Sequence, residues 1–293
     1  MKKKWHKISL AFFLCIALIG TLLRAMPFLD LTANYSFLLH AHSHLAFQGW
    51  IYTMILLLVP KLFLSPEQIV KSRYPLQFKL TVPLLMCILI SFSFEGYSIL
   101  SIILSTLFQV LTYWFIFSFF KDTSRTTQDG NSISFVKTGF WFSLLSSIAP
   151  YFVGILSAKN MQDSEFYEAA IYFFLHFQYN GWFIFTILGI AIKILETKNI
   201  RISSRHLNLF LKLMTVSTVL LYCHSLLGMS FGFSVFIPSF IGASLQLFAA
   251  FILAKAIRGL MAKKSGWVQI LIYLALLGFF LKVILQLFSH IPS

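Results

Sequence analysis

The stretch His40-Ala-His-Ser-His-Leu-Ala-Phe-Gln-Gly-Trp50 lies inside an apolar segment long enough to cross a membrane. A related stretch, His176-Phe-Gln-Tyr-Asn-Gly-Trp182, lies in a second such segment, and aligning the Gly-Trp pairs places His44 against His176. Histidine is costly in hydrocarbon, so a histidine within a membrane segment indicates a functional role. Two copies at one interval favour ligands of a metal or haem over chance occurrence.

The composition indicates a membrane protein. The chain has 293 residues, of which 58% are hydrophobic and only 11% are charged. Soluble domains do not have this composition, and apolar runs of about 20 residues can cross about 30 Å of hydrocarbon. We therefore expect an all-α, polytopic transmembrane helical bundle. The nine expected spans are about 8–28, 36–60, 77–95, 98–120, 136–157, 166–194, 207–229, 236–257 and 267–289.

The basic residues predict the orientation of the chain. The net charge is +14, but the charges lie in the loops between apolar segments, which argues against nucleic-acid binding. With the amino terminus in the cytoplasm, only Arg24 and Lys159 of the 23 basic residues lie outside, and Lys282 falls within the last span. The positive-inside rule then predicts an external carboxyl terminus. We expect an integral protein of a bacterial inner membrane.

The repeated motif divides the chain into two parts. We expect a first four-helix repeat at 1–120, a second at 135–258, and a final transmembrane helix at 265–293. The polar segment Lys121–Ser134 is the expected hinge between the halves. The first apolar run follows a lysine-rich start and lacks a convincing cleavage site, so we interpret it as a retained helix. The three cysteines are isolated and predict no disulfide framework.

Helix geometry separates the histidines of the first motif. At 3.6 residues per turn, His40 and His44 share a face, whereas His42 points nearly opposite. The residues on the shared face are His40, His44 and Gln48 in the first copy, and His176 and Asn180 in the second. Neutral imidazole suits copper, iron and zinc. The amides of Gln48 and Asn180 are expected to hydrogen-bond around the ligands.

Other residues near the motifs extend the candidate site. His224 lies near the outer end of the seventh expected span, and Tyr179, Trp50 and Trp182 flank the motif histidines. The histidines can also be read as hydrogen-bonding groups between helices, and the two tryptophans as packing residues or cofactor contacts. We favour a packing role for the glycines that precede the tryptophans, because small residues allow close helix approach. Lys282 requires a partner or must extend to the interface.

These features resemble the haem–copper oxidase subunit I superfamily, including its small NnrS-like and nitric-oxide-reductase-like relatives. The resemblance rests on the phrase His-Ala-His-Ser-His-Leu-Ala-Phe-Gln-Gly-Trp and on histidines in spans two, six and seven. It implies haem b and/or copper, with His44, His176 and His224 as metal ligands assisted by His40. It also implies respiratory redox chemistry or nitric oxide handling, with a quinol or a redox protein as partner. The chain has nine expected spans where the family has twelve, which favours one haem or one copper over the full set.

A second interpretation belongs to another class. The chain can be a transporter or a membrane-embedded protein in which the histidines relay protons or bind an ion. Transporters often contain repeats. A repeat of four spans leaves both copies in the same orientation, which fits the oxidase scaffold and a transporter alike. An optical spectrum distinguishes the two interpretations, because haem has characteristic absorption bands.

Overall fold

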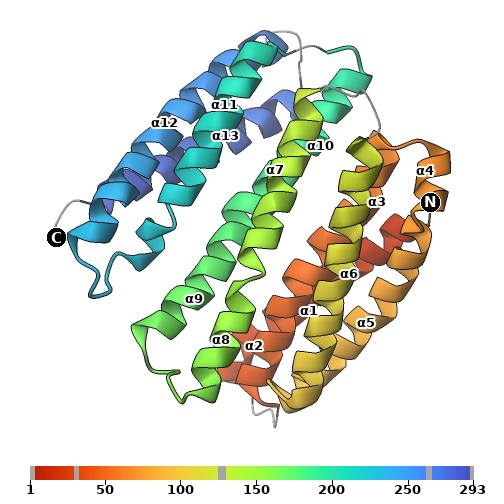
Figure 1. Cartoon of the computed structure of the whole chain (residues 1–293), viewed down its shortest axis with the longest axis vertical. Helices are drawn as coiled ribbons and strands as arrows, with labels where there is room; N and C mark the ends of the chain where they lie inside the picture. Colours follow the sequence, from red (N-terminus) through yellow and green to blue (C-terminus); the bar gives the residue numbers. More distant parts are fainter. Residues whose placement is uncertain (1–3, 30–32, 125–129, 201, 262–265, 291–293) are drawn as a thin grey trace. The chain divides into compact units, whose positions relative to one another are not determined.

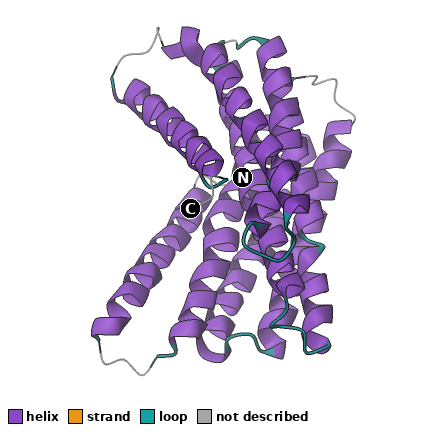
Figure 2. Cartoon of the chain, turned by 90° about the vertical axis from the view of Figure 1, so that its left-hand side faces the viewer, coloured by secondary structure: helices purple, strands orange, loops and turns teal. Residues whose placement is uncertain are grey.

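The computed structural model describes residues 4–29, 33–124, 130–200, 202–261 and 266–290 (Figure 1). These residues are almost entirely helical and contain no strand (Figure 2). Within them, nine helices are long and apolar enough to cross a membrane, which confirms the expected fold class. Their bounds are Trp5–Phe28, Tyr35–Phe63, Tyr74–Glu95, Ile99–Ser124, Asn131–Ala158, Glu165–Thr197, Ser204–Leu226, Phe233–Arg258 and Gln269–Phe288.

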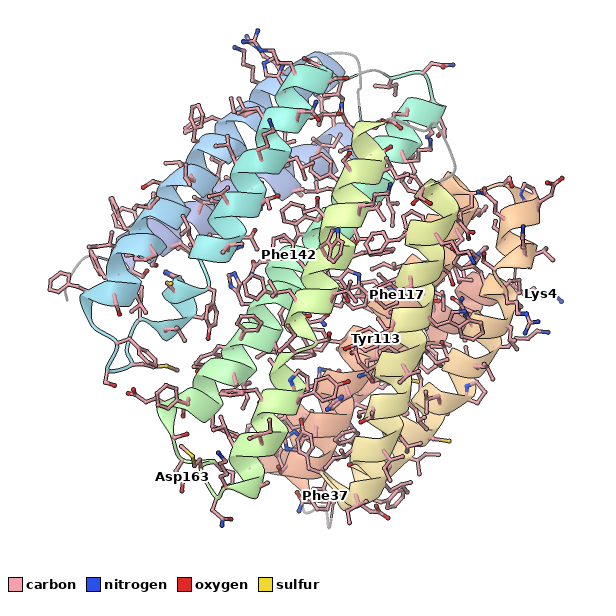
Figure 3. The ribbon with its side chains drawn as sticks, viewed as in Figure 1. Lys4, Phe37, Tyr113, Phe117, Phe142 and Asp163 are labelled. Carbon is pink, nitrogen blue, oxygen red and sulfur yellow. The ribbon has the colours of Figure 1, made fainter. Side chains whose placement is uncertain are left out.

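The outer surfaces of these helices are those of a membrane protein. Large apolar side chains are widely exposed, including Phe94 at 78% and Phe117 at 57%. Phe117 and its ring neighbour Tyr113 lie along one helix of the first half (Figure 3). A soluble monomer rarely exposes continuous apolar surface of this extent. The chain is therefore an integral membrane protein.

The chain folds as two compact units, Met1–Gln128 and Asp129–Ser293. The division falls within the expected hinge Lys121–Ser134, of which residues 125–129 lie outside the described part. The first unit contains α1 (Trp5–Ala25), η1 (Met26–Phe28), α2 (Tyr35–His44), η2 (Leu45–Tyr52), α3 (Thr53–Phe63), α4 (Pro66–Lys71), α5 (Tyr74–Glu95) and α6 (Ile99–Ser124). The second contains α7 (Asn131–Ser146), α8 (Ala149–Ala158), α9 (Glu165–His176), η3 (Phe177–Phe183), α10 (Ile184–Thr197), α11 (Ser204–Leu220), η4 (Cys223–Leu226), α12 (Phe233–Met261) and α13 (Trp267–Phe288).

Contacts near the amino-terminal end of α1 join this helix to α3 and α5. Thr53 at the start of α3 donates a buried 2.8 Å hydrogen bond to Ser9 of α1. Trp5 stacks on Phe78 of α5 with ring centroids 4.7 Å apart. The expected first span therefore packs within the unit as a membrane helix.

A buried carboxylate that the sequence analysis did not single out joins α4, α5 and α6. Asp122 accepts hydrogen bonds of 2.9 Å from both Ser72 and Tyr74. Gln68 donates to the Asp122 backbone carbonyl at 3.0 Å. Because each buried oxygen of the carboxylate has a donor, this charge is accommodated at the end of α6.

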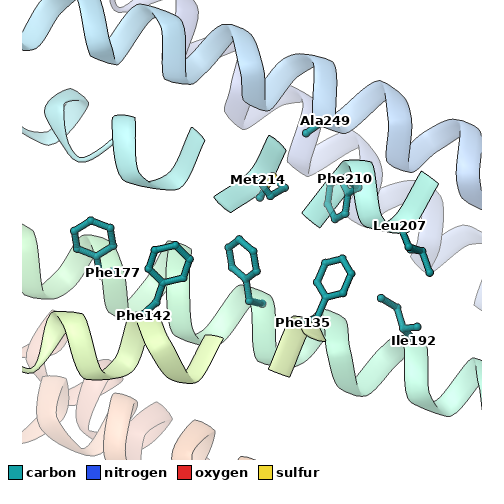
Figure 4. Close-up of a cluster of buried hydrophobic side chains, with 9 residues drawn as sticks. Phe135, Phe142, Phe177, Ile192, Leu207, Phe210, Met214 and Ala249 are labelled. Carbon is teal, nitrogen blue, oxygen red and sulfur yellow. The ribbon is translucent and has the colours of Figure 1, made fainter. Parts of the chain in front are cut away.

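The core of the second unit is a row of aromatic rings between α7, α10 and α11 (Figure 4). Phe142 stacks on Phe177 at 5.6 Å, and Phe135 stacks on Phe210 at 5.9 Å. Glycine allows the backbones to approach: a Cβ added at Gly181 would lie 2.6 Å from Phe142. Small residues at helix crossings serve this purpose in membranes.

Candidate functional site

One histidine of each motif is the last residue of an α-helix before a π-helix. α2 ends at His44 and the π-helix η2 begins at Leu45; α9 ends at His176 and the π-helix η3 begins at Phe177. π-helices are rare and occur frequently at functional sites. The sequence repeat is therefore accompanied by a matching irregularity in the backbone of both copies.

The first motif presents its histidines on two faces, as helix geometry predicted. The rings of His40 and His44 both contact Tyr97, with centroid distances of 4.6 and 5.9 Å. The ring of His42 instead lies against Gly20 of α1. The separation of His42 from the other two histidines is thus confirmed.

His44 is held by aromatic side chains. Its ring stacks on Phe92 at 4.1 Å, and its Nε2 lies 3.3 Å from the hydroxyl of Tyr97. On the following turn, the side-chain oxygen of Gln48 is buried and has no hydrogen-bond partner among the described residues. A buried amide oxygen without a donor is costly, so this part of the motif has unused hydrogen-bonding capacity.

The Gly-Trp pair of the first motif packs against α1. A Cβ added at Gly49 would lie 2.8 Å from Leu45 and 3.3 Å from Phe12. The ring of Trp50 lies 4.4 Å from that of Phe13. Both contacts agree with the packing role that the sequence favoured.

In the second motif, hydrogen bonds define the protonation of His176. Its Nε2 lies 2.7 Å from the backbone carbonyl of Thr218 in α11. A carbonyl only accepts, so Nε2 carries the proton, and the Nδ1 of the neutral ring presents a lone pair. The amide nitrogen of Asn180 approaches this Nδ1 at 3.4 Å, a long contact. Ligating histidines commonly donate their other ring N–H to a backbone carbonyl in this way.

Asn180 also supplies the partner that Lys282 required. The ammonium of Lys282 in α13 donates to the Asn180 side-chain oxygen at 2.8 Å. In the part of the chain that the structure describes, the one ion pair is Lys193 with Glu196, so no carboxylate neutralises Lys282 there.

A second hydrogen-bonded chain fixes the tautomer of His224. The Nδ1 of His290 donates to the Gln286 carbonyl at 2.8 Å, so the Nε2 of neutral His290 accepts from the Ser239 hydroxyl at 2.7 Å. The Ser239 oxygen is then free to accept from the Nδ1 of His224 at 3.1 Å. The Nε2 of His224 therefore presents a lone pair.

The remaining predicted residues of the second motif have packing contacts. Trp182 is buried, and its ring lies 4.8 Å from that of Phe183. Tyr179 is about half exposed, with its ring 6.2 Å from Phe183. Gln178, which the sequence analysis did not select, is buried and donates to Ser146 at 2.8 Å. The two ring contacts lie within η3, and the Gln178–Ser146 hydrogen bond joins η3 to the end of α7.

The histidines suit ligation singly, but the described residues of neither unit form a complete metal site. The lone pairs on His176 Nδ1 and His224 Nε2 fit a metal or haem iron, and each ring is oriented by its second nitrogen. Among the described residues, no group of three or more histidine, cysteine or acidic side chains is placed to hold a metal ion. His44 and His40 belong to the first unit, and His176 and His224 to the second. A single site shared by the two units remains a prediction.

Three hydrogen-bonding partners were absent from the predicted site. They are the Thr218 carbonyl, the Ser239 hydroxyl and the His290 imidazole. A backbone carbonyl and an isolated serine carry no sequence signal. His290 had a sequence signal, since it follows the last apolar segment, but nothing in the sequence linked it to His224.

No protein-family model, curated protein or solved structure matches the chain.

Proposed function

We propose that this integral membrane protein binds haem b and/or copper through its two histidine motifs, in respiratory redox chemistry or nitric oxide handling. His44 and His176 are the proposed principal ligands, with His40 and His224 assisting. The observation that carries the proposal is the matched change from α-helix to π-helix directly after each principal histidine. Two copies of a costly residue at two equivalent backbone irregularities indicate a shared purpose.

The hydrogen bonds of the histidines support ligation. His176 donates Nε2–H to a backbone carbonyl, which leaves Nδ1 as an acceptor that the Asn180 amide approaches at 3.4 Å, and His224 has an available Nε2. Near the first motif, the unpartnered oxygen of Gln48 provides an acceptor for a bound group or a water. A haem or copper ion would supply one-electron redox chemistry, for which imidazole is a suitable ligand.

The proposed setting is a bacterial inner membrane with the amino terminus in the cytoplasm and the carboxyl terminus outside. The distribution of lysine and arginine supports this orientation. The proposed electron source is a quinol in the bilayer or a redox partner protein. Both motif histidines would then lie in the external half of the membrane.

An optical spectrum of the purified protein tests the proposal. We expect a Soret band and a reduced-minus-oxidised signal for haem, or bound copper without a Soret band. His44→Ala and His176→Ala should each remove the cofactor, whereas His6→Ala, an exposed residue at the start of α1, should retain it. Retention of the full signal in both motif variants would refute the assignment of the ligands.

A second candidate function is supported by the polar chain of the second unit. Lys282, Asn180 and His176 are connected by hydrogen bonds, as are His224, Ser239 and His290. Such chains of ionisable groups mark proton or ion pathways in membranes. A histidine-dependent transporter would show proton or ion flux in proteoliposomes without a cofactor, and Lys282→Met would stop it. Flux that is absent from cofactor-free protein would exclude this function.

A further inference from the structure

The face of the first motif that carries His42 borders a cavity that the proposed function does not use. The cavity has a volume of about 450 Å³ and lies between α1 and α2 in the first unit. Phe13, Ala17 and Leu39 line its apolar part, and Arg24, Tyr35 and His42 contribute polar groups. Along α1 the lining runs from Phe13 to Arg24, so the cavity is apolar near Phe13 and cationic near Arg24, and the His42 ring lies between these ends beside Gly20.

The cavity is a groove along α1, and its length matches the thickness of one leaflet of a bilayer. Phe13, Ala17, Thr21 and Arg24 follow one another at spacings of four, four and three residues, which places them on one face of α1. At 1.5 Å per residue this stripe is about 16 Å long. Half of a hydrocarbon core of about 30 Å is nearly the same length. Arg24 lies in the last turn of α1, at one end of this stripe.

Arg24 and His42 each have a polar group that can bind a ligand in the cavity. Arg24 is exposed and forms no ion pair with a described residue. The Nδ1 of His42 is buried and has no hydrogen-bond partner among the described residues. Gly20 makes room for this ring, because a Cβ there would lie 2.8 Å from His42 Cε1. A guanidinium and a ring nitrogen together suit an oxyanion with a nearby ester.

We propose that this groove is a binding site for an acidic phospholipid. Arg24 and the Tyr35 hydroxyl hold the phosphate, His42 hydrogen-bonds an ester oxygen, and one acyl chain lies along Phe13 and Ala17. The charge of Arg24 selects an anionic headgroup, and the apolar stripe selects a lipid over free phosphate. The site lies on the helix face opposite His44 and stands independently of the proposed cofactor.

The test measures the thermal stabilisation of detergent-purified protein by phosphatidylglycerol, phosphatidylcholine and inorganic phosphate. We expect stabilisation by phosphatidylglycerol alone. Arg24→Gln should weaken the apparent affinity about tenfold, because a charge-assisted hydrogen bond is lost. Lys159→Gln, a matched exposed cation in the second unit, should leave the affinity unchanged.

Groove-filling variants distinguish a lipid from a free anion. Ala17→Phe and Leu39→Trp, on opposite walls, should each abolish the response to phosphatidylglycerol, whereas Ala11→Phe, at an exposed position outside the cavity, should not. Elution volume and circular dichroism confirm that each variant is folded. Equal stabilisation by inorganic phosphate that survives Ala17→Phe would overturn the proposal, as would equal responses to the two lipids.

Discussion

The ammonium of Lys282 donates a 2.8 Å hydrogen bond to the side-chain oxygen of Asn180, across 102 residues of sequence. This contact joins the last helix, α13, to the second histidine motif. The same Asn180 side chain approaches Nδ1 of His176, so a single amide lies between a basic amine and a candidate ligand. The two motif copies therefore differ: the equivalent amide oxygen of Gln48 has no partner among the described residues.

The Lys282–Asn180 contact predicts energetic coupling. Lys282→Met and Asn180→Leu should each destabilise the protein by about 1–3 kcal/mol, because each leaves a partly buried polar partner unsatisfied. The double variant should lose less than the sum of the single losses, with a coupling of about 0.5–3 kcal/mol. Unfolding in detergent measures the four proteins, and Lys255→Met, at an exposed position of α12, is the control. Additive losses would show that the two side chains do not interact.

The close approach of Gly181 to Phe142 predicts that Gly181 and Gly154 respond differently to replacement by alanine. Gly181→Ala should destabilise by about 1–3 kcal/mol, since its Cβ would overlap Phe142 in a filled core. Gly154→Ala is the matched change in α8, where an added Cβ meets nothing within 4 Å and alanine favours the helix. Melting temperatures of the two variants should therefore shift in different directions. Equal shifts would contradict the packing of α7 against η3.

The sequence predicted the helices well, and it also predicted that the histidines of the first motif lie on two faces of one helix. Apolar length alone placed the second span at 36–60, close to the observed Tyr35–Phe63. The periodicity of 3.6 residues also separated His42 from His40 and His44, because neighbouring positions on a helix are determined locally. These features depend on short segments and not on the rest of the fold.

The contacts of the site depended on tertiary structure and could not be predicted. Asn180 was expected to hydrogen-bond near a ligand, but its partner Lys282 comes from another helix. Ser239 connects His224 to His290 only because α12 and α13 bring them together. The π-helices were also missed, since the motif residues carry no known signal for the extra residue per turn.

The positive-inside rule predicts the topology. Reporter fusions after residue 293 and within the 121–134 loop should report an external carboxyl terminus and a cytoplasmic loop. Nine membrane-length helices among the described residues require the two ends of the chain to lie on opposite sides if each crosses once. A cytoplasmic signal from the carboxyl-terminal fusion would refute both the number of crossings and the external position of the histidines.

The two faces of α2 predict a contrast between neighbouring histidines. His44→Ala should abolish cofactor binding, because it removes a proposed ligand. His42→Ala should retain the cofactor, since the His42 ring faces Gly20 of α1 and not Tyr97. Gln48→Ala should fall between them, with about a 10- to 100-fold loss of affinity. The optical spectrum or bound metal of each variant gives the comparison, and the reverse order would move the site to the opposite face.

The metal content of the purified wild-type protein tests the central claim most directly. Elemental analysis should find about one iron or copper ion per chain, as imidazole ligands favour these metals. The His44→Ala and His176→Ala proteins, purified in parallel, should lack that metal while eluting as folded protein. Folded wild-type protein that contains neither iron nor copper, and shows no haem spectrum after supplementation with both metals and haem, would contradict the account.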